Sequence, residues 1–195
     1  RRGSTRTVEY IRFQDITKLD DDDFHYVDCG VARNYGTPTA IITGLSHLEG
    51  KSVVAWADGS TFPAMTVASG QVTLPAAISD VHIGLAIDTQ VETLRPEIPL
   101  NGTGQGKYKQ IENAIVRLYR SAGGSIGLAD GYKAPFSVWR SATQAWEAVS
   151  APYTGDLEAR IATPIEKDAR LTISHATPAP FNLLAVIYRV GIKEM

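Results

Sequence analysis

The sequence predicts an all-β protein made of two small modules. The chain has 195 residues, of which 17 are glycine and 10 are proline, and these turn-forming residues are spread along its whole length. The runs between them are short, and they either alternate polar and apolar side chains or are rich in β-branched residues, as strands are. A chain of this length buries enough surface for one domain or two small ones.

An extended arm is expected at residues 1–36. The arm begins basic, becomes acidic at residues 20–23 and includes a candidate strand at 24–29. Because strongly apolar side chains are few in its first part, we expect a partner chain to order it. The basic start consists of Arg1, Arg2, Arg6 and Arg12.

A small β-barrel or sandwich is expected at residues 37–100. Its strongest turn signal is the pair Asp58 and Gly59, which favours a two-residue hairpin, and Ser69 and Gly70 predict a second turn. A helical interpretation is disfavoured, because β-branched residues dominate and glycine or proline interrupts every helix-like period. The expected strands are 39–45, 51–57, 62–67, 71–74 and 81–87.

A glycine-rich linker at 101–107 is expected to separate this module from a β-sandwich-like domain at 108–195. The apolar positions of 110–120 fit either a helix or a strand. We expect a strand, because 181–192 is a long segment that can pair with it. The remaining elements are expected to be strands at 157–162 and 169–175, and either a short helix or a loop carrying Trp146 at 141–149.

The linker does not complete a phosphate-binding loop. Such a loop needs a preceding strand and a lysine followed by Ser or Thr. Here Lys107 is followed by Tyr108, and Pro99 and Leu100 precede the glycines instead of a strand. A flexible linker is therefore favoured, and we expect no cofactor. The glycines in question are Gly102, Gly104 and Gly106.

Metal-binding and catalytic patterns are missing from the sequence. The acidic run at 20–23 lacks the glycine and the distant glutamate of a calcium loop. The single cysteine, Cys29, excludes an internal disulfide and a cysteine-based zinc site, and the neighbouring Asp28 weakens it as a nucleophile beside His25. Ser174 precedes His175 without a Gly-x-Ser-x-Gly elbow. The four histidines are too far apart for a short metal-binding motif: His25, His47, His82 and His175.

From these patterns we expect no catalytic, cofactor-binding or metal-binding residues and no enzyme activity. A formal net charge of −2 and a pI of about 6.1 provide no basic field for nucleic acid or for an anionic membrane. No segment approaches the roughly 20 apolar residues of a transmembrane helix. We therefore expect neither specific nucleic-acid binding nor a membrane span.

The three tryptophans point to one alternative function. Trp56 lies in an expected strand and is expected in the core. Trp139 and Trp146 are near prolines and are better placed for the surface, where aromatic rings stack on sugars or anchor interfaces. The alternative is a carbohydrate-binding or receptor-binding module.

Part of the first module resembles a β domain found in virion proteins of tailed bacteriophages. The pattern starts with 43–53 (TGLSHLEGKSV) and continues with 57–59 (ADG), 70–74 (GQVTL) and 81–85 (VHIGL). This domain is often compared with a small β subdomain of ubiquitin-activating enzymes. The resemblance continues through 104–107, 118–121, 153–157 and 178–186.

The resemblance implies a structural protein of the nozzle, tail-tube or stabilisation type in a short-tailed phage. In such proteins these segments are C-terminal parts of longer polypeptides that build rings at the end of the tail. Because this chain starts at Arg1 rather than Met, we expect it to be such a portion. No catalytic residue is transferred, since Cys29 lies outside the similar blocks.

The same resemblance implies the partners and the location. The partners are other copies in a homo-oligomeric ring, other phage tail proteins and, under the alternative function, a glycan of the host surface. The location is the virion tail, after synthesis in the cytoplasm of the bacterial host. We expect the arm at 1–36, basic and then acidic, to orient neighbouring subunits through opposite charge.

Overall fold

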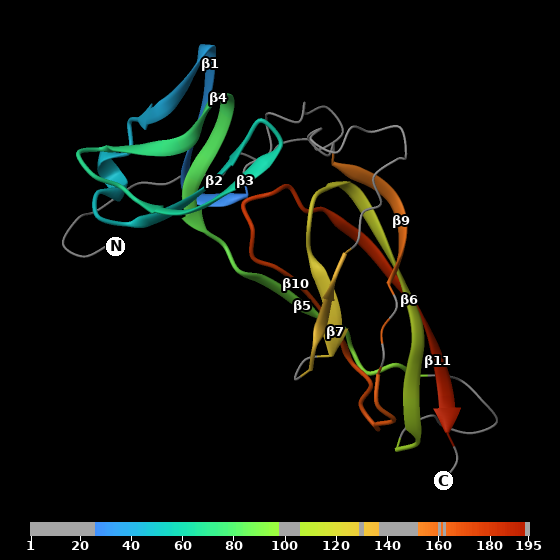
Figure 1. Cartoon of the computed structure of the whole chain (residues 1–195). Coiled ribbons are helices and arrows are strands. Elements are labelled where there is room, and N and C mark those ends of the chain that lie inside the picture. The colour runs from blue at the N-terminus through green and yellow to red at the C-terminus, as the bar shows by residue number, and fades with distance from the viewer. Residues whose placement is uncertain are drawn as a thin grey trace.

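The computed structural model describes residues 26–97, 106–128, 131–136, 152–159, 161 and 163–193. These residues form three antiparallel sheets and one short 3-10 turn, Ser46–Leu48, so the expected all-β fold is confirmed. Figure 1 shows two lobes: an N-terminal lobe that contains β1 to β4 and a C-terminal lobe that contains β5 to β11. Within the described part of the chain, no helix has the length and apolar character that crossing a bilayer requires.

The N-terminal lobe is one four-stranded sheet that curves around its own core (Figure 1). Side chains alternate along its strands, so that Val53, Ala55 and Ala57 are buried on one face. The strands lie in the order β1-β4-β2-β3, with bounds β1 Val27–Thr43, β2 Ser52–Ala57, β3 Ser60–Thr66 and β4 Gln71–Ala86. The core consists of Ile42, Leu45, Leu48, Val53, Ala55, Ala57, Val67, Val72, Leu74, Ile78, Val81 and Ile83.

Both predicted turns of this lobe are confirmed. Asp58 and Gly59 join β2 to β3 with φ angles of 44° and 74°, and Ser69 and Gly70 have φ angles of 56° and 69°. Positive φ at both central residues is the geometry that matches the twist of a hairpin.

One long strand, β4, replaces the two short strands that were expected at 71–74 and 81–87. The pairing of β4 with β1 is interrupted between these segments, where residues 74–77 lie opposite the single residue Ala40. Pro75 lies in this irregular part and has no N–H to give to a ladder. The strand therefore bends there without ending.

The C-terminal lobe packs two sheets around a second core. One sheet has the order β5-β10-β7-β8 and the other the order β11-β6-β9. The bounds are β5 Thr89–Glu92, β6 Tyr108–Ser121, β7 Ser125–Leu128, β8 Lys133–Pro135, β9 Tyr153–Ala159, β10 Leu171–His175 and β11 Leu183–Lys193. The core consists of Ile111, Ala114, Val116, Leu118, Ile126, Phe136, Ala159, Ala169, Leu171 and Ile173.

The strand interpretation of 110–120 is confirmed, and so is its expected partner. β6 pairs antiparallel with β11 from Leu118 opposite Leu183 to Tyr108 opposite Lys193. Burial alternates along β6, since Ala114, Val116 and Leu118 are buried. A helix would have placed Val116 on the face opposite Ala114 and Leu118.

Two segments join sheets outside the units expected for them. Residues 27–36 were assigned to the arm, but they belong to β1 and pair with β4. Val27 in this segment is buried. Residues 89–92, assigned to the first module, form β5 and pair with β10 of the C-terminal lobe. The expected short helix at 141–149 lies outside the described residues, as do 1–25 and most of the linker, 98–105.

A hydrogen bond ties the start of β1 to the C-terminal lobe. The hydroxyl of Tyr26 donates to Oδ1 of Asn182 over 2.9 Å, across 156 positions of sequence. Burial of the Tyr26 hydroxyl raises its pKa, because the charged phenolate is costly away from water. The two lobes are therefore joined both by the chain at 87–88 and by this contact.

Candidate functional site

Cys29 and His47 are neighbours in space, but they do not form a nucleophile and a base. Nε2 of His47 lies 2.9 Å from the backbone oxygen of Cys29, which can only accept a hydrogen bond. The Cys29 thiol lies 3.5 Å from Oδ1 of Asp28. His47 therefore fastens the 3-10 turn to β1, while His25 lies outside the described residues.

Two carboxylates of the N-terminal lobe bind backbone amides and hold loops in place. Glu49 accepts hydrogen bonds of 2.8 and 2.7 Å from the N–H groups of Ser69 and Gly70. Asp58 accepts two bonds of 2.9 Å from the N–H groups of residues 79 and 80. Both oxygens of each carboxylate accept these bonds. The two side chains therefore act as structural caps of backbone amides rather than as acid–base groups.

His82 and His175 lie inside strands, as expected, and both are only 5% exposed. The His175 ring stacks on Phe181 with a centroid separation of 4.7 Å and an interplanar angle of 7°. Nε2 of His175 lies 3.0 Å from the Thr177 hydroxyl. Burial lowers the pKa of His175, so that the neutral ring is favoured in this environment.

An aromatic stack continues from His175 across the end of the lobe. Phe181 also faces Phe136, with ring centroids 6.2 Å apart. Gly124 lies against both phenylalanine rings, and a Cβ at this position would be 2.7 Å from each of them. The φ of Gly124 is +101°, which side chains rarely adopt. The stack is a packing feature and encloses no ligand-sized space at Gly124.

Lys109 has a fully buried side chain, and it belongs to none of the motifs considered in the sequence. It is 0% exposed, and its Nζ donates a hydrogen bond of 3.1 Å to the backbone oxygen of Lys167. The backbone groups of Lys109 exchange two hydrogen bonds with Glu166, of 2.7 and 2.9 Å. The position had one available signal, because strand alternation places it on the same face as buried Ile111.

An open hollow of about 560 Å³ lies between the segment after β5 and the start of β10. Both of its arginines are in ion pairs, since Arg95 is 2.6 Å from Asp168 and Arg170 is 2.5 Å from Glu92, and Glu97 lines it as an exposed residue. These side chains are about half exposed or a third exposed, so each pair contributes little to stability. The hollow therefore lacks the buried, unpaired groups of a reactive site.

The other sequence-derived candidates are divided between described and undescribed parts of the chain. Trp56 is described, and the expectation that it belongs to the core is wrong: it is half-buried on the face opposite Val53 and Ala55. Trp139 and Trp146 lie outside the described residues, so the carbohydrate-binding alternative stays a prediction. Among the described His, Cys, Asp and Glu residues, no group of three is placed to hold a metal ion.

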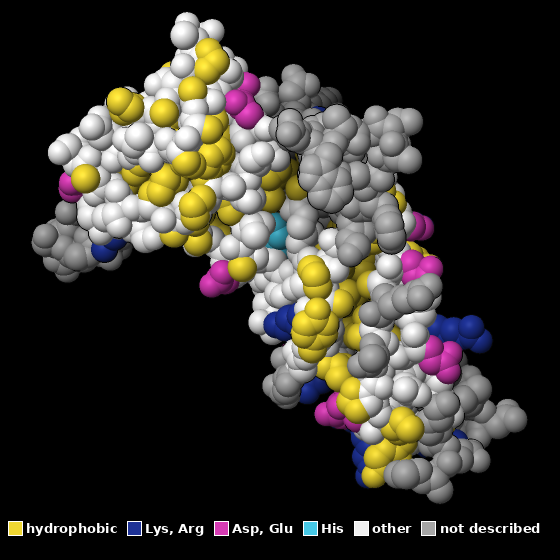
Figure 2. Space-filling view, in the orientation of Figure 1, with side chains coloured by type: hydrophobic (Ala, Val, Ile, Leu, Met, Phe, Trp, Pro, Cys, Tyr) yellow, Lys and Arg dark blue, Asp and Glu magenta, His cyan; other side chains and the backbone are white. Residues whose placement is uncertain are grey.

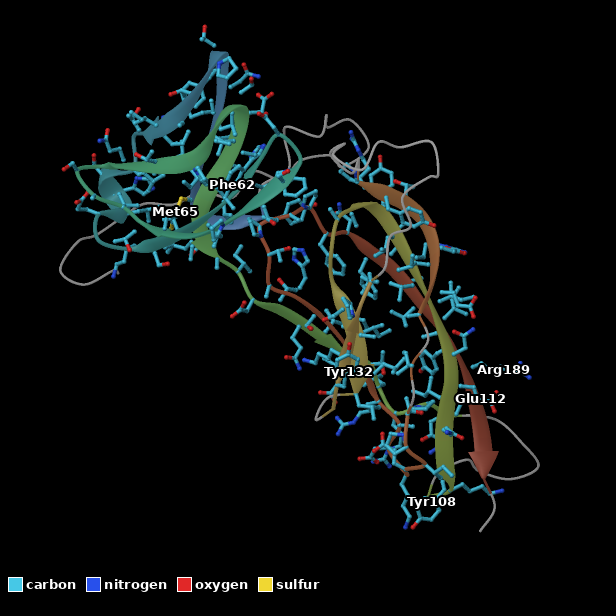
Figure 3. All side chains as sticks on the ribbon, viewed as in Figure 1. Phe62, Met65, Tyr108, Glu112, Tyr132 and Arg189 are labelled. Carbon is cyan, nitrogen blue, oxygen red and sulfur yellow. The ribbon has the colours of Figure 1, made fainter. Side chains whose placement is uncertain are left out.

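The β11-β6-β9 sheet, here called the outer sheet, has one face that points away from the core. Its charged residues pair across the strands: Arg117 binds Asp156 through two bonds of 2.7 and 2.8 Å, and Arg189 lies 3.3 Å from Glu112. The hydrogen bond from Arg117 lowers the pKa of Asp156. Figure 3 shows Arg189 and Glu112 on the outer side of the lobe, with Arg189 extending away from the strands.

No protein-family model matches the chain, and no curated protein is significantly similar to it. A functional conclusion therefore depends on the resemblance described above and on the contacts of the described residues.

Proposed function

We propose that the chain is a structural component of a bacteriophage tail, of the nozzle or tail-tube type, that acts through subunit–subunit contacts without catalysis. The positions of the residues in the similar blocks support this proposal, because these residues form the core and a turn of the N-terminal lobe. Leu45 and Leu48 are buried in the N-terminal lobe, and Glu49 holds the turn at Ser69 and Gly70. The shared pattern is thus one that builds a β module.

The observation that carries the proposal is the open edge of the β11-β6-β9 sheet, because its long outer strand β11 has a neighbour on one side only among the described strands. Each described sheet ends in two outer strands, and none of the three closes into a barrel within the described residues. Outer strands present unpaired N–H and C=O groups, which are templates for pairing with another chain. A long outer strand of this kind offers a surface on which one subunit can pair with the next in a ring.

The chemistry of the described side chains agrees with a role in shape and contact. Glu49 and Asp58 cap loops, Lys109 anchors a backbone segment, and the ion pairs near Arg95 are satisfied among themselves. Each of these charged groups therefore has a structural partner. The virion tail is the location that follows from this proposal.

The test is the mass of the 195-residue chain in solution, measured by light scattering, together with negative-stain images. The proposed function predicts a closed ring or short tube with a central lumen. A monomer at every protein concentration up to the millimolar range would contradict it. Clearing of bacterial cell wall in a zymogram would replace it with an enzymatic function.

A further inference from the structure

The outer edge of β11 differs from the other outer strands of the described sheets. β5 and β8 have only four and three residues, β3 contains Pro63, and the pairing of β1 with β4 has three register shifts. Each of these features discourages pairing with another chain. β11 has 11 residues without proline. Its pairing with β6 shifts register between Leu183 and Ala185 and between Arg189 and Val190, and the run 185–189 between these shifts is uninterrupted.

β11 also exposes apolar side chains. Leu184 is 56% exposed and Ile187 is 47% exposed. A long outer strand with exposed apolar residues is a predicted site of strand addition. Among the described strands, none pairs with β11 on the side away from β6.

β9, the opposite edge of the same sheet, has the complementary charge. It contains Asp156 and Glu158 and no basic residue, whereas β11 contains Arg189 and no acidic residue. Figure 2 shows acidic and basic side chains along the side of the lobe that carries β9 and β11. The side chain of Arg189 is 82% exposed and therefore accessible to a second carboxylate beside Glu112.

The charged residues of both edges lie on the same face of the sheet. Ile187 is opposite Ile115 of β6, and Ile115 is opposite Glu158 of β9. Residues directly opposite one another share a face, and so does Arg189, two positions from Ile187. If the sheet continued into a second copy, Arg189 of one edge and Glu158 of the other would therefore project to the same side.

The inward faces of the two edges are incomplete. Val186, Tyr188 and Val190 on β11, like Tyr153 and Leu157 on β9, pack against the core but stay partly exposed. Placing the two edges side by side would cover these side chains and extend one core into the next. Burial of apolar surface of this kind is the main favourable contribution to association.

Strand direction determines the symmetry of such a contact. β9 and β11 both run antiparallel to β6, so they run parallel to each other. When subunits are related by rotation about an axis roughly along the strands, β11 of one copy meets β9 of the next in a parallel ladder. This contact uses two different surfaces, and heterologous contacts of this type form a ring when the rotation between neighbouring copies closes.

We propose that the outer edge of β11 binds the outer edge of β9 in a second copy of this chain, so that the outer sheet continues from subunit to subunit. This proposal rests on the proposed function and specifies the contact by which the ring forms. Arg189 faces Glu158 across the contact and selects the register and the partner edge, as charged groups at interfaces do.

The test uses two charge-reversal variants of the whole chain, Glu158→Arg and Arg189→Glu, in sedimentation velocity over a range of concentrations. Each variant alone places like charges across the contact, so we expect the concentration for half-assembly to rise by about tenfold. In an equimolar mixture the two variants can alternate around the ring. Every contact then again joins one acidic and one basic side chain. We expect the mixture to assemble like the wild-type chain.

Matched controls reverse exposed charges elsewhere. Asp88→Arg lies between the lobes and Lys51→Glu lies in the N-terminal lobe, and neither is expected to change assembly. Thermal melting shows that each variant is folded. If a reversal variant melts early, the neutral variants Glu158→Gln and Arg189→Gln replace the pair, and each is expected to weaken assembly by a smaller factor.

The outcomes separate this contact from the proposed function. Wild-type rings that are unaffected by the variants overturn the β11–β9 contact and leave the proposed function standing. An effect of Arg189→Glu without an effect of Glu158→Arg indicates pairing of β11 with β11 and also overturns it. A wild-type chain that remains a monomer overturns both.

Discussion

His175 gives the protein a pH dependence whose sign follows from its burial. Its pKa is lowered in the folded state, chiefly by desolvation, while the unfolded chain keeps the ordinary value of about 6.5. Below about pH 6.5 the unfolded state therefore binds more protons than the folded state. The His175 contribution to stability is intact above this pH and is lost as the pH falls towards the lower, folded-state pKa.

We therefore expect the free energy of unfolding to decrease between about pH 6.5 and pH 5, measured by urea denaturation at a series of pH values. His175→Gln should reduce this slope. An equal slope in the His175 variant would exclude this residue as its source.

Gly124 is a second residue whose environment permits few alternatives. In Gly124→Ala the new methyl group would meet Phe136 and Phe181 at 2.7 Å and would occupy a backbone conformation with φ of +101°. We expect a loss of about 2–4 kcal/mol of unfolding free energy, from crowding and backbone strain together. Gly36→Ala, which has open space around it, should change stability by less than about 1 kcal/mol.

Among the elements, the turn at Ser69 and Gly70 depends on a distant side chain. Glu49 accepts both backbone N–H groups of this turn. Glu49→Ala leaves them without their acceptor, and we expect a loss of about 1–3 kcal/mol in chemical denaturation. Faster hydrogen exchange of these two amides should accompany the loss, while exchange in the C-terminal lobe stays unchanged. Uniform acceleration in both lobes would contradict a local role.

The strands of the N-terminal lobe show which elements can be predicted from neighbouring residues and which cannot. The β2–β3 hairpin was predictable, because a two-residue turn and alternating side chains are encoded by neighbouring residues. β4 was not, because its two parts, 71–73 and 78–86, pair with the same strand, β1, on either side of the interruption at 74–77. Trp56 shows the same limit: alternation in β2 places it opposite Val53 and Ala55, but which face is buried depends on the other strands.

For the whole molecule, the contact between the lobes at Tyr26 determines how many N-terminal residues can be removed without loss of stability. We expect removal of residues 1–25 to abolish ring assembly, by loss of the charged arm, and to preserve the β-sheet signal in circular dichroism. Removal of 1–30 also deletes the Tyr26 hydroxyl that binds Asn182 and the buried Val27. This second truncation should lower the melting temperature by several degrees. Ring formation by the shorter truncation, seen by negative stain, would exclude a role of the arm in assembly.

The assembly surface illustrates the division between local and long-range information. That 181–192 would form a long strand was visible in its sequence, and so was the basic character of Arg189. That β11 and β9 are the two edges of one sheet follows from the position of β6 between them. Complementary edges became recognisable only once this strand order was known.

The all-β class and both glycine turns were specified by the sequence, because each depends on residues that are neighbours in the chain. The strand at 110–120 was chosen over a helix because of a distant partner, 181–192. The assignment of β5 to the second lobe, the burial of Lys109 and the continuity of β4 came from the folded molecule. They depend on contacts between segments up to 86 positions apart, such as Thr89 with His175. Such pairings are chosen by the burial that they achieve together, which no short stretch of sequence encodes.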